Sequence, residues 1–258
     1  MDFTLSMYGS LMDSIVEEEY YTPRMSEFIE KKLWLTGEYN CVLRHDVDRK
    51  LRNALRIAEL EARKGVVSTY YVRYVPGVYK VDVLKDIESM GHEIGFHYEC
   101  MDKAKGDVGE AMDIFERELE DMRKDFDIKT ICMHGRPFGS WRNKDMWDKY
   151  DYADFGLLGE PYIDIDYSQV AYFTDTGRQW NSTTSVKDYV ESGDLASSMG
   201  LQPASTGELI GVVRSGDLTK IVILAHPNRW TDSRLEWMWE LGWQRTKNIG
   251  KIFLKRKS

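Results

Sequence analysis

The chain has 258 residues, of which 42% are hydrophobic and 30% are charged, a composition typical of a globular protein with a sizeable core. Lysine and arginine number 35 against 43 aspartate and glutamate residues, so the formal net charge is −8. This balance argues against a surface for nucleic acid or anionic membranes, where clustered basic side chains are expected. The longest apolar run, residues 221–225, is far shorter than the roughly 18 residues of a membrane helix. We expect neither a nucleic-acid partner nor a transmembrane segment.

The three cysteines, Cys41, Cys100 and Cys132, are odd in number and show no CxxC spacing. That pattern excludes a disulfide scaffold and a zinc ribbon. The first residues lack the basic and apolar regions of a secretory signal. We therefore expect a cytoplasmic protein.

From residue 39 onward, short apolar runs alternate with amphipathic segments. We expect strands at residues 41–45, 66–74, 93–97, 130–134, 153–157, 170–174, 221–225 and 252–254. We expect helices at residues 25–33, 51–64, 81–90, 109–124, 208–214 and 234–241. Repeated alternation of strand and helix implies right-handed crossovers and a parallel sheet, open or closed into a barrel. We expect one domain over residues 1–258, with residues 1–38 as a helical N-terminal extension.

Four of the five histidines lie at or just after the end of an expected strand: His45, His97, His134 and His226. Catalytic groups of parallel α/β folds gather at this end of the strands. Each histidine taken singly is explained as a hydrogen-bonded core or loop residue. Four together favour a functional site at this edge of the sheet.

A pair of carboxylates, Asp46 and Asp48, follows the expected strand at residues 41–45. Two carboxylates at this spacing suit a metal centre, where one binds the ion and its neighbour accepts a proton from water. A structural alternative is that Asp48 caps the following helix. For His45, adjacent to the pair, we expect a hydrogen-bonding role.

Six short segments between residues 41 and 230 follow one family pattern in order. They are residues 45–48 (His-Asp-Val-Asp), 65–72, 91–97 (Gly-His-Glu-Ile-Gly-Phe-His), 135–139, 175–180 and 224–226. Together they resemble the polysaccharide deacetylases of NodB-homology type, which are carbohydrate esterases of family four in the broad sense. The segment 91–97 is the most specific match, and the chain resembles a divergent member.

The resemblance implies a fold and a reaction. The implied fold is α/β, a distorted (β/α) barrel of about seven parallel strands. The implied reaction is metal-dependent hydrolysis that removes an N- or O-acetyl group from a sugar or glycoconjugate precursor. The cofactor would be a divalent metal, expected to be Zn²⁺, and the partner an acetylated sugar.

The resemblance also implies roles for individual residues. Asp48 and His97 would bind the metal, Asp46 would be the general base, and His226 would be the general acid. Arg136 would belong to the catalytic set by orienting the base, although a solvated loop arginine is an alternative there.

Two further matches are looser. Asp175 would orient the acid. Trp180 would line the acyl pocket, but a core tryptophan explains that residue equally well.

The sequence departs from the family at Met101, where a second metal-binding histidine is usual, four residues after His97. A thioether is a poor ligand for Zn²⁺. We favour His134 as the third metal ligand, because imidazole is the donor that the family uses and the residue ends a strand at the same edge. Glu99 is the alternative, and Cys100 is a more distant one.

Two other functions stay open at this point. A chain without a complete metal site would be a catalytically inactive carbohydrate-binding relative. An amidohydrolase acting on another small C–N bond would also fit. The metal content of the purified protein distinguishes a deacetylase from the inactive binding relative. Activity on a panel of N-acetyl sugars and cyclic amides distinguishes a deacetylase from the other amidohydrolase.

Overall fold

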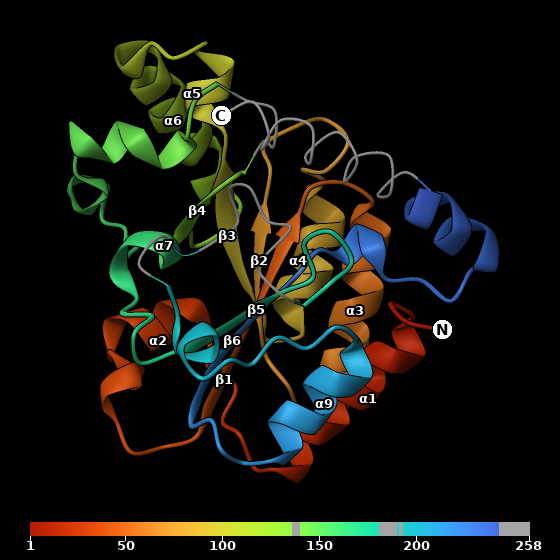
Figure 1. Cartoon of the computed structure of the whole chain (residues 1–258). Helices are drawn as coiled ribbons and strands as arrows, with labels where there is room; N and C mark the ends of the chain where they lie inside the picture. Colours follow the sequence, from red (N-terminus) through yellow and green to blue (C-terminus); the bar gives the residue numbers. More distant parts are fainter. Residues whose placement is uncertain (136–139, 181–189, 191–192, 243–258) are drawn as a thin grey trace.

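The computed structural model describes residues 1–135, 140–180, 190 and 193–242. Its centre is a parallel sheet in the order β4-β3-β2-β1-β6-β5, curved into a half-barrel with helices around it (Figure 1). The strands are β1 (Asn40–Val47), β2 (Thr69–Val72), β3 (Glu93–Tyr98), β4 (Ile131–Met133), β5 (Ala171–Thr174) and β6 (Lys220–Ala225). The expected α/β class with a barrel-like parallel sheet is confirmed, with six strands in the described residues instead of about seven.

α-Helices and several 3₁₀ turns surround the sheet. The α-helices are α1 (Leu5–Glu17), α2 (Met25–Glu30), α3 (Leu51–Arg63), α4 (Val81–Ser89), α5 (Cys100–Lys103), α6 (Val108–Arg123), α7 (Pro161–Asp164), α8 (Leu195–Ser198) and α9 (Thr206–Arg214). The 3₁₀ turns are η1 (Leu33–Leu35), η2 (Asn143–Asp148), η3 (Tyr152–Phe155) and η5 (Pro227–Arg229). Residues 234–242 are also helical. Within the described part of the chain, no helix has both the length and the apolar composition needed to span a bilayer.

The expected strand at residues 153–157 is wrong, because the turn η3 occupies this stretch. The Asp151 side chain accepts a hydrogen bond from the Ala153 N–H and begins the turn, and Gly156 ends it with φ of 67°. Such local capping competes with an extended backbone. The expected strand at residues 252–254 lies outside the described residues.

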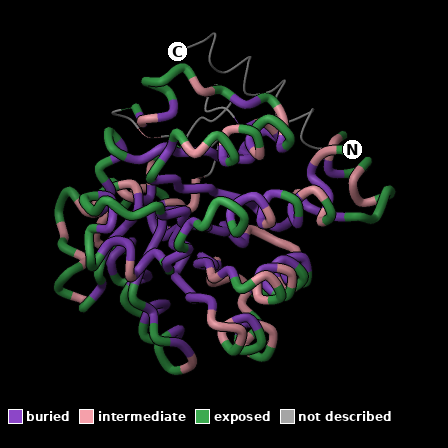
Figure 2. Tube along the Cα trace, turned by 90° about the horizontal axis from the view of Figure 1, so that it is seen from below, coloured by how far each residue is buried: buried purple, intermediate pink, exposed green. Residues whose placement is uncertain are grey.

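The sheet has two faces of different character, because successive side chains of a strand point to opposite sides. Side chains such as Leu43, Phe96 and Ile223 form the larger core on the outer face, with residues of α1, α3, α4, α6 and α9. Val42 and Leu224 belong to a smaller core on the inner face, which α2 and η1 cover. Figure 2 shows the buried central strands inside a shell of partly exposed helices and loops.

The strand register brings distant parts of the chain to one edge of the sheet. Asp46 pairs with Tyr71, Tyr71 with Gly95, and His97 with Cys132. Because all six strands are parallel, their carboxyl ends meet at the same edge. The sequence motifs at the ends of β1, β3, β4 and β6 therefore lie close together.

Candidate active site

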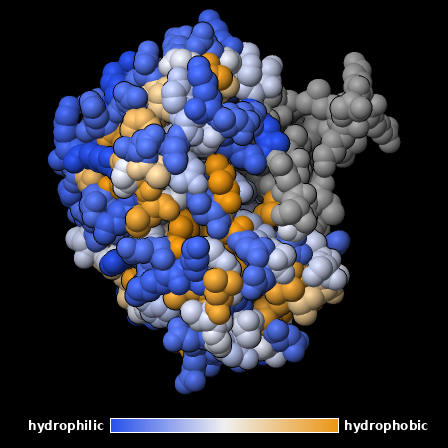
Figure 3. Space-filling view, turned by 90° about the vertical axis from the view of Figure 1, so that its left-hand side faces the viewer, coloured by the Kyte–Doolittle hydropathy of each residue, from blue (hydrophilic) through white to orange (hydrophobic). Residues whose placement is uncertain are grey.

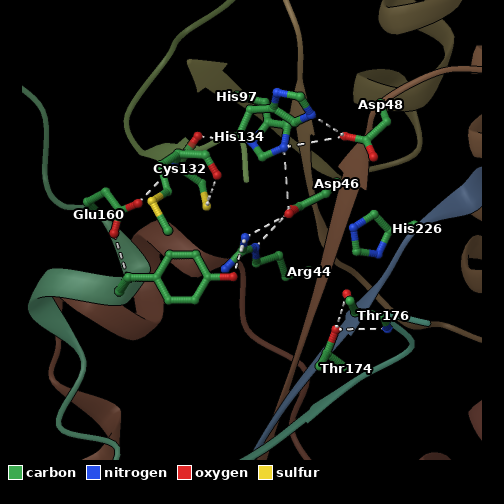
Figure 4. Close-up of polar contacts among 12 residues, drawn as sticks. Arg44, Asp46, Asp48, His97, Cys132, His134, Glu160, Thr174, Thr176 and His226 are labelled. Carbon is green, nitrogen blue, oxygen red and sulfur yellow. Dashed lines mark hydrogen bonds and ion pairs between the residues drawn. The ribbon is translucent and has the colours of Figure 1, made fainter. Parts of the chain in front are cut away.

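The alternation of side chains decides which motif residues face one another. Asp46 in β1, His97 in β3 and Cys132 in β4 share the inner face, while His45 points to the outer face. Figure 4 shows Asp46, Asp48, His97, His134 and His226 gathered at the carboxyl edge of the sheet. All four strand-end histidines thus lie at this edge, but only three of them face the aspartates.

The three expected metal ligands, Asp48, His97 and His134, come together. The Asp48 Oδ1 lies 3.6 Å from His97 Nε2 and 3.5 Å from His134 Nε2. The three donor atoms lie within 4.8 Å of one another. The Asp48 Oδ1 is buried and accepts no hydrogen bond of suitable geometry. One carboxylate oxygen and two imidazole nitrogens form the kind of donor set that catalytic zinc sites use.

The His97 ring is held by the neighbouring strand. Its Nδ1 lies 3.0 Å from the Cys132 carbonyl oxygen, so this nitrogen carries the proton and donates it. The Nε2 lone pair is then directed at Asp48. A backbone carbonyl that fixes the tautomer in this way is the common arrangement behind a metal-binding histidine.

The His134 ring lies against Glu99, the alternative ligand. Its Nδ1 lies 3.2 Å from Glu99 Oε2, on the side of the ring away from Asp48. Arg73 donates a 2.7 Å hydrogen bond to the same Glu99 oxygen and another of 3.1 Å to the Asp48 carbonyl. Burial would raise the pKa of Glu99, but His134 and Arg73 lower it to about 2. Glu99 is therefore an ionised partner behind His134, a carboxylate–histidine pair of the type that supports metal ligands.

Asp46 is engaged by an arginine to which the sequence analysis gave no role. Arg44 Nε donates to Asp46 Oδ1 at 2.9 Å, and an Nη of the same guanidinium donates to Oδ2 at 2.7 Å. The guanidinium also lies over the Tyr162 ring, 4.6 Å from its centre. Burial raises the pKa of Asp46, but Arg44 and His97 outweigh it and hold the pKa below its usual value. A signal was present in the sequence: residues two apart in a strand share a face.

His226 lies beside Asp46 and Asp48 (Figure 4). Its Nδ1 is 2.7 Å from Asp175 Oδ1, and its backbone N–H donates to Asp175 Oδ2 at 2.9 Å. Arg229 and Trp230 also donate to this carboxylate. Burial would raise the pKa of Asp175, but Arg229 and His226 lower it to about 2. The structure thus places Asp175 against His226 as the resemblance implies.

A second group of donor atoms joins Asp46, His97 and Cys132, all buried. Both oxygens of Asp46 already accept hydrogen bonds from Arg44, and a guanidinium repels a cation placed beside it. The group with Asp48 and His134 therefore fits a metal ion better.

The remaining sequence-derived residues lie away from the metal-compatible group or outside the described residues. Arg136 falls outside the described residues. Trp180 packs against Phe3 and Trp230 in the core, its structural alternative. Met101 and Cys100 are buried in the larger core.

His45 takes the hydrogen-bonding role expected for it. Its Nε2 lies 2.8 Å from Glu61 Oε1, in the core of the outer face. The fifth histidine, His92, contacts Ser68 and the Ala58 carbonyl on the same side of the sheet.

Comparisons with known proteins connect this architecture with two solved structures. No protein-family profile matches the chain, and no curated protein matches it significantly. The structure of Bacillus subtilis PdaA, a family 4 carbohydrate esterase, is similar with 12% identity over 91% of this chain and 82% of that one, at a TM-score of 0.43. A Streptococcus mutans CE4 esterase is similar with 13% identity over 94% of this chain and 90% of that one, at a TM-score of 0.49.

Proposed function

We propose that this chain is a metal-dependent hydrolase that removes an acetyl group from a sugar or glycoconjugate. The observation that carries the proposal is the close group of Asp48, His97 and His134 donor atoms, adjacent to an arginine-held carboxylate and an aspartate-held histidine. The order of the family-like motifs along the chain supports the acetylated sugar as substrate.

The three side chains that would hold the ion are Asp48, His97 and His134. The unbonded Asp48 oxygen and the two orientated imidazoles fit a divalent cation of the zinc type. Such an ion supplies Lewis-acid polarisation of the acyl oxygen and lowers the pKa of water. His134 would fill the position that Met101 leaves without a suitable donor.

Asp46 would accept the proton of the attacking water. The Arg44 guanidinium holds its carboxylate in one orientation, and the low pKa keeps it ionised at neutral pH. The same guanidinium weakens Asp46 as a base, so positioning has to supply part of the rate.

His226 would protonate the leaving amine or alkoxide. Asp175 occupies its Nδ1, which leaves Nε2 as the atom that exchanges a proton with the substrate. The Asp175 carboxylate holds the ring in this orientation.

The direct test combines metal analysis with a deacetylation assay on chitooligosaccharides and N-acetylglucosamine. We expect about one zinc ion per chain after reconstitution and release of acetate. Asp46→Asn should abolish hydrolysis and retain the metal, because the amide cannot accept the proton. Loss of the metal with the activity would mean that the roles of Asp46 and Asp48 are reversed.

A second series tests the ligand set. His134→Ala should remove tight zinc binding, whereas Glu99→Gln should weaken it by roughly 10- to 100-fold, as expected for a partner behind a ligand. Met101→Leu is the matched control, since this buried core residue should bind no metal. Full zinc affinity in His134→Ala would disprove the assignment, and a larger loss in Glu99→Gln would make Glu99 the ligand.

A further inference from the structure

A pocket of about 730 Å³ lies between the turn η2, the start of η3 and helix α7. Its volume is in the range of pockets that bind small molecules. Four aromatic side chains contribute to its lining: Trp147, Tyr150, Tyr152 and Tyr162. Figure 3 views the molecule from the side on which α7 lies in Figure 1, where apolar groups are interspersed among hydrophilic ones.

The polar ends of two of these rings are bonded to the protein. Trp147 Nε1 donates to the Tyr98 hydroxyl at 2.8 Å. The Tyr152 hydroxyl donates to the Asp164 carboxylate, with its two oxygens at 2.8 Å and 2.9 Å. The two rings meet nearly at a right angle, with their centres 5.4 Å apart. Because their polar ends are engaged, these fixed rings offer a ligand mainly carbon surface.

The charged side chains of the pocket do not form a cationic cradle. Its lining includes three carboxylates and two basic groups: Asp145, Asp148, Asp151, Arg142 and Lys144. Arg142 Nε also lies 3.7 Å from Asp145, which offsets part of its charge. Carboxylates accept hydrogen bonds from hydroxyl groups and repel phosphate. The lining therefore suits a neutral ligand rich in hydroxyl groups better than a nucleotide.

The pocket adjoins the candidate active site. Tyr162 lines the pocket, and its hydroxyl accepts a hydrogen bond of 3.3 Å from the Arg44 guanidinium that holds Asp46. The turn η2 is attached to the same site, because Asn143 Nδ2 donates to the His134 carbonyl at 2.9 Å. The pocket is thus connected through single side chains to the proposed base and to a proposed metal ligand.

We propose that this pocket binds a neutral sugar residue of the substrate that is linked to the acetylated one. Aromatic carbon packs against the C–H faces of a sugar ring, and carboxylates accept hydrogen bonds from its hydroxyl groups. Because Tyr162 lies between Arg44 and the pocket, a neighbouring residue of a sugar chain bound at Asp46 is the part that meets the pocket. The pocket would select an oligosaccharide over a free monosaccharide, a conclusion that rests on the proposed function.

The test is isothermal titration calorimetry of the full chain with chitotetraose and cellotetraose, each compared with its monosaccharide. Cellotetraose carries no acetyl group, so its binding is measured without turnover. At least one tetrasaccharide should bind about 10-fold more tightly than its monosaccharide, as expected when one more sugar face is buried. Equal affinity of both tetrasaccharides and their monosaccharides would overturn the proposal. Tighter binding of uridine monophosphate than of any sugar would overturn the choice of ligand.

Variants assign the preference to the pocket. Tyr150→Ala removes a partly exposed ring and should abolish most of the roughly 10-fold preference. Asp148→Ala removes an exposed carboxylate and should lower the preference several-fold. The matched control is Tyr39→Ala, because Tyr39 is 42% exposed directly before β1, at the opposite edge of the sheet. A wild-type preference in both pocket variants, or an equal loss in Tyr39→Ala, would show that the preference does not arise in this pocket.

Acetate release from chitotetraose and N-acetylglucosamine, measured on the same samples, reports the proposed function separately. A tetrasaccharide preference without acetate release would disprove the hydrolase and retain the pocket as a sugar-binding site. Acetate release with equal kcat/KM for the two substrates, together with equal affinities, would disprove the role of the pocket and retain the hydrolase.

Discussion

Asp46 and Asp48 are two residues apart, yet their side chains have different partners. Both Asp46 oxygens accept hydrogen bonds from Arg44, whereas Asp48 Oδ1 faces two imidazoles without a hydrogen bond. Burial raises the pKa of Asp48, but His97 and His134 lower it well below its usual value. The two carboxylates are chemically alike, so their surroundings divide the proposed roles of base and ligand between them.

Arg44 is predicted to position the base. In Arg44→Gln, burial would dominate and raise the pKa of Asp46, so the acid limb of the kcat/KM–pH profile should move to higher pH. We expect kcat to fall roughly 100-fold, since small misplacements of a catalytic group cost about that much. Arg44→Lys should restore part of the profile but not the geometry of two parallel hydrogen bonds.

The kinetics of Arg44 variants should be measured well below their unfolding temperature, because breaking a buried ion pair lowers the free energy of unfolding by about 3–5 kcal/mol. A wild-type pH profile in Arg44→Gln, with only the stability changed, would reduce Arg44 to a structural residue.

His226 is predicted to act on the leaving group. His226→Ala should lower kcat by roughly 10²- to 10⁴-fold with a small effect on KM, because a general acid works mainly in the transition state. Steady-state deacetylation kinetics provide the measurement. His92→Asn is the matched control on the outer face of the sheet and should change stability without changing kcat. Undiminished turnover in His226→Ala would exclude the acid role.

At the scale of elements, β1 serves two polar networks at once. Its Arg44 and Asp46 side chains face the candidate site, and His45 faces Glu61 of α3 on the other side. Glu61 also accepts hydrogen bonds of 2.7 Å from Ser68 and Tyr70, and one from Tyr8 of α1. One buried carboxylate thus joins α1, α3, β1 and the region of β2.

Glu61 is predicted to make stability depend on acid pH. Burial would raise its pKa, but His45 and its other partners lower it from 4.5 to about 2. A depressed folded-state pKa stabilises the fold above the unfolded value near 4.5, and that contribution disappears as the pH falls toward 2. It amounts to on the order of 3 kcal/mol.

Urea unfolding of the wild type and Glu61→Gln between pH 6 and pH 2 provides the measurement. The wild type should lose more unfolding free energy on acidification than the variant, which lacks the titrating group. Parallel pH curves for the two proteins would show that Glu61 is not the group responsible.

At the scale of the whole molecule, the proposed metal ties β1, β3 and β4 together and should stabilise the fold. A ligand that binds only the folded state at 100 times its Kd adds about 2.7 kcal/mol, which raises the Tm of a chain of this size by about 5–10 °C. Calorimetry with zinc and with a chelator should show this shift in the wild type and in Met101→Leu. The shift should be absent in His134→Ala. An identical Tm with zinc and with chelator in the wild type would argue against a specific site.

Element prediction succeeded where the pattern was local and long. The helix expected at residues 51–64 is observed as α3, and the strand expected at residues 93–97 as β3. The strand expected at residues 153–157 is wrong, because capping by Asp151, and not the apolar content, decides the backbone conformation of that short segment. The expected boundaries are also wrong where an expected strand is too long. Of residues 66–74, only β2 pairs in the sheet.

The sequence by itself determined the parallel α/β architecture and the edge of the sheet at which the histidines and aspartates meet. These properties follow from side-chain periodicity and from the direction of parallel strands. The motif resemblance already implied the contact of Asp175 with His226, whereas only the tertiary structure decided the contacts of Arg44 with Asp46 and of Glu99 with His134. Most of these contacts join residues far apart in the chain, and their orientation depends on packing between strands and loops, which no local spacing specifies.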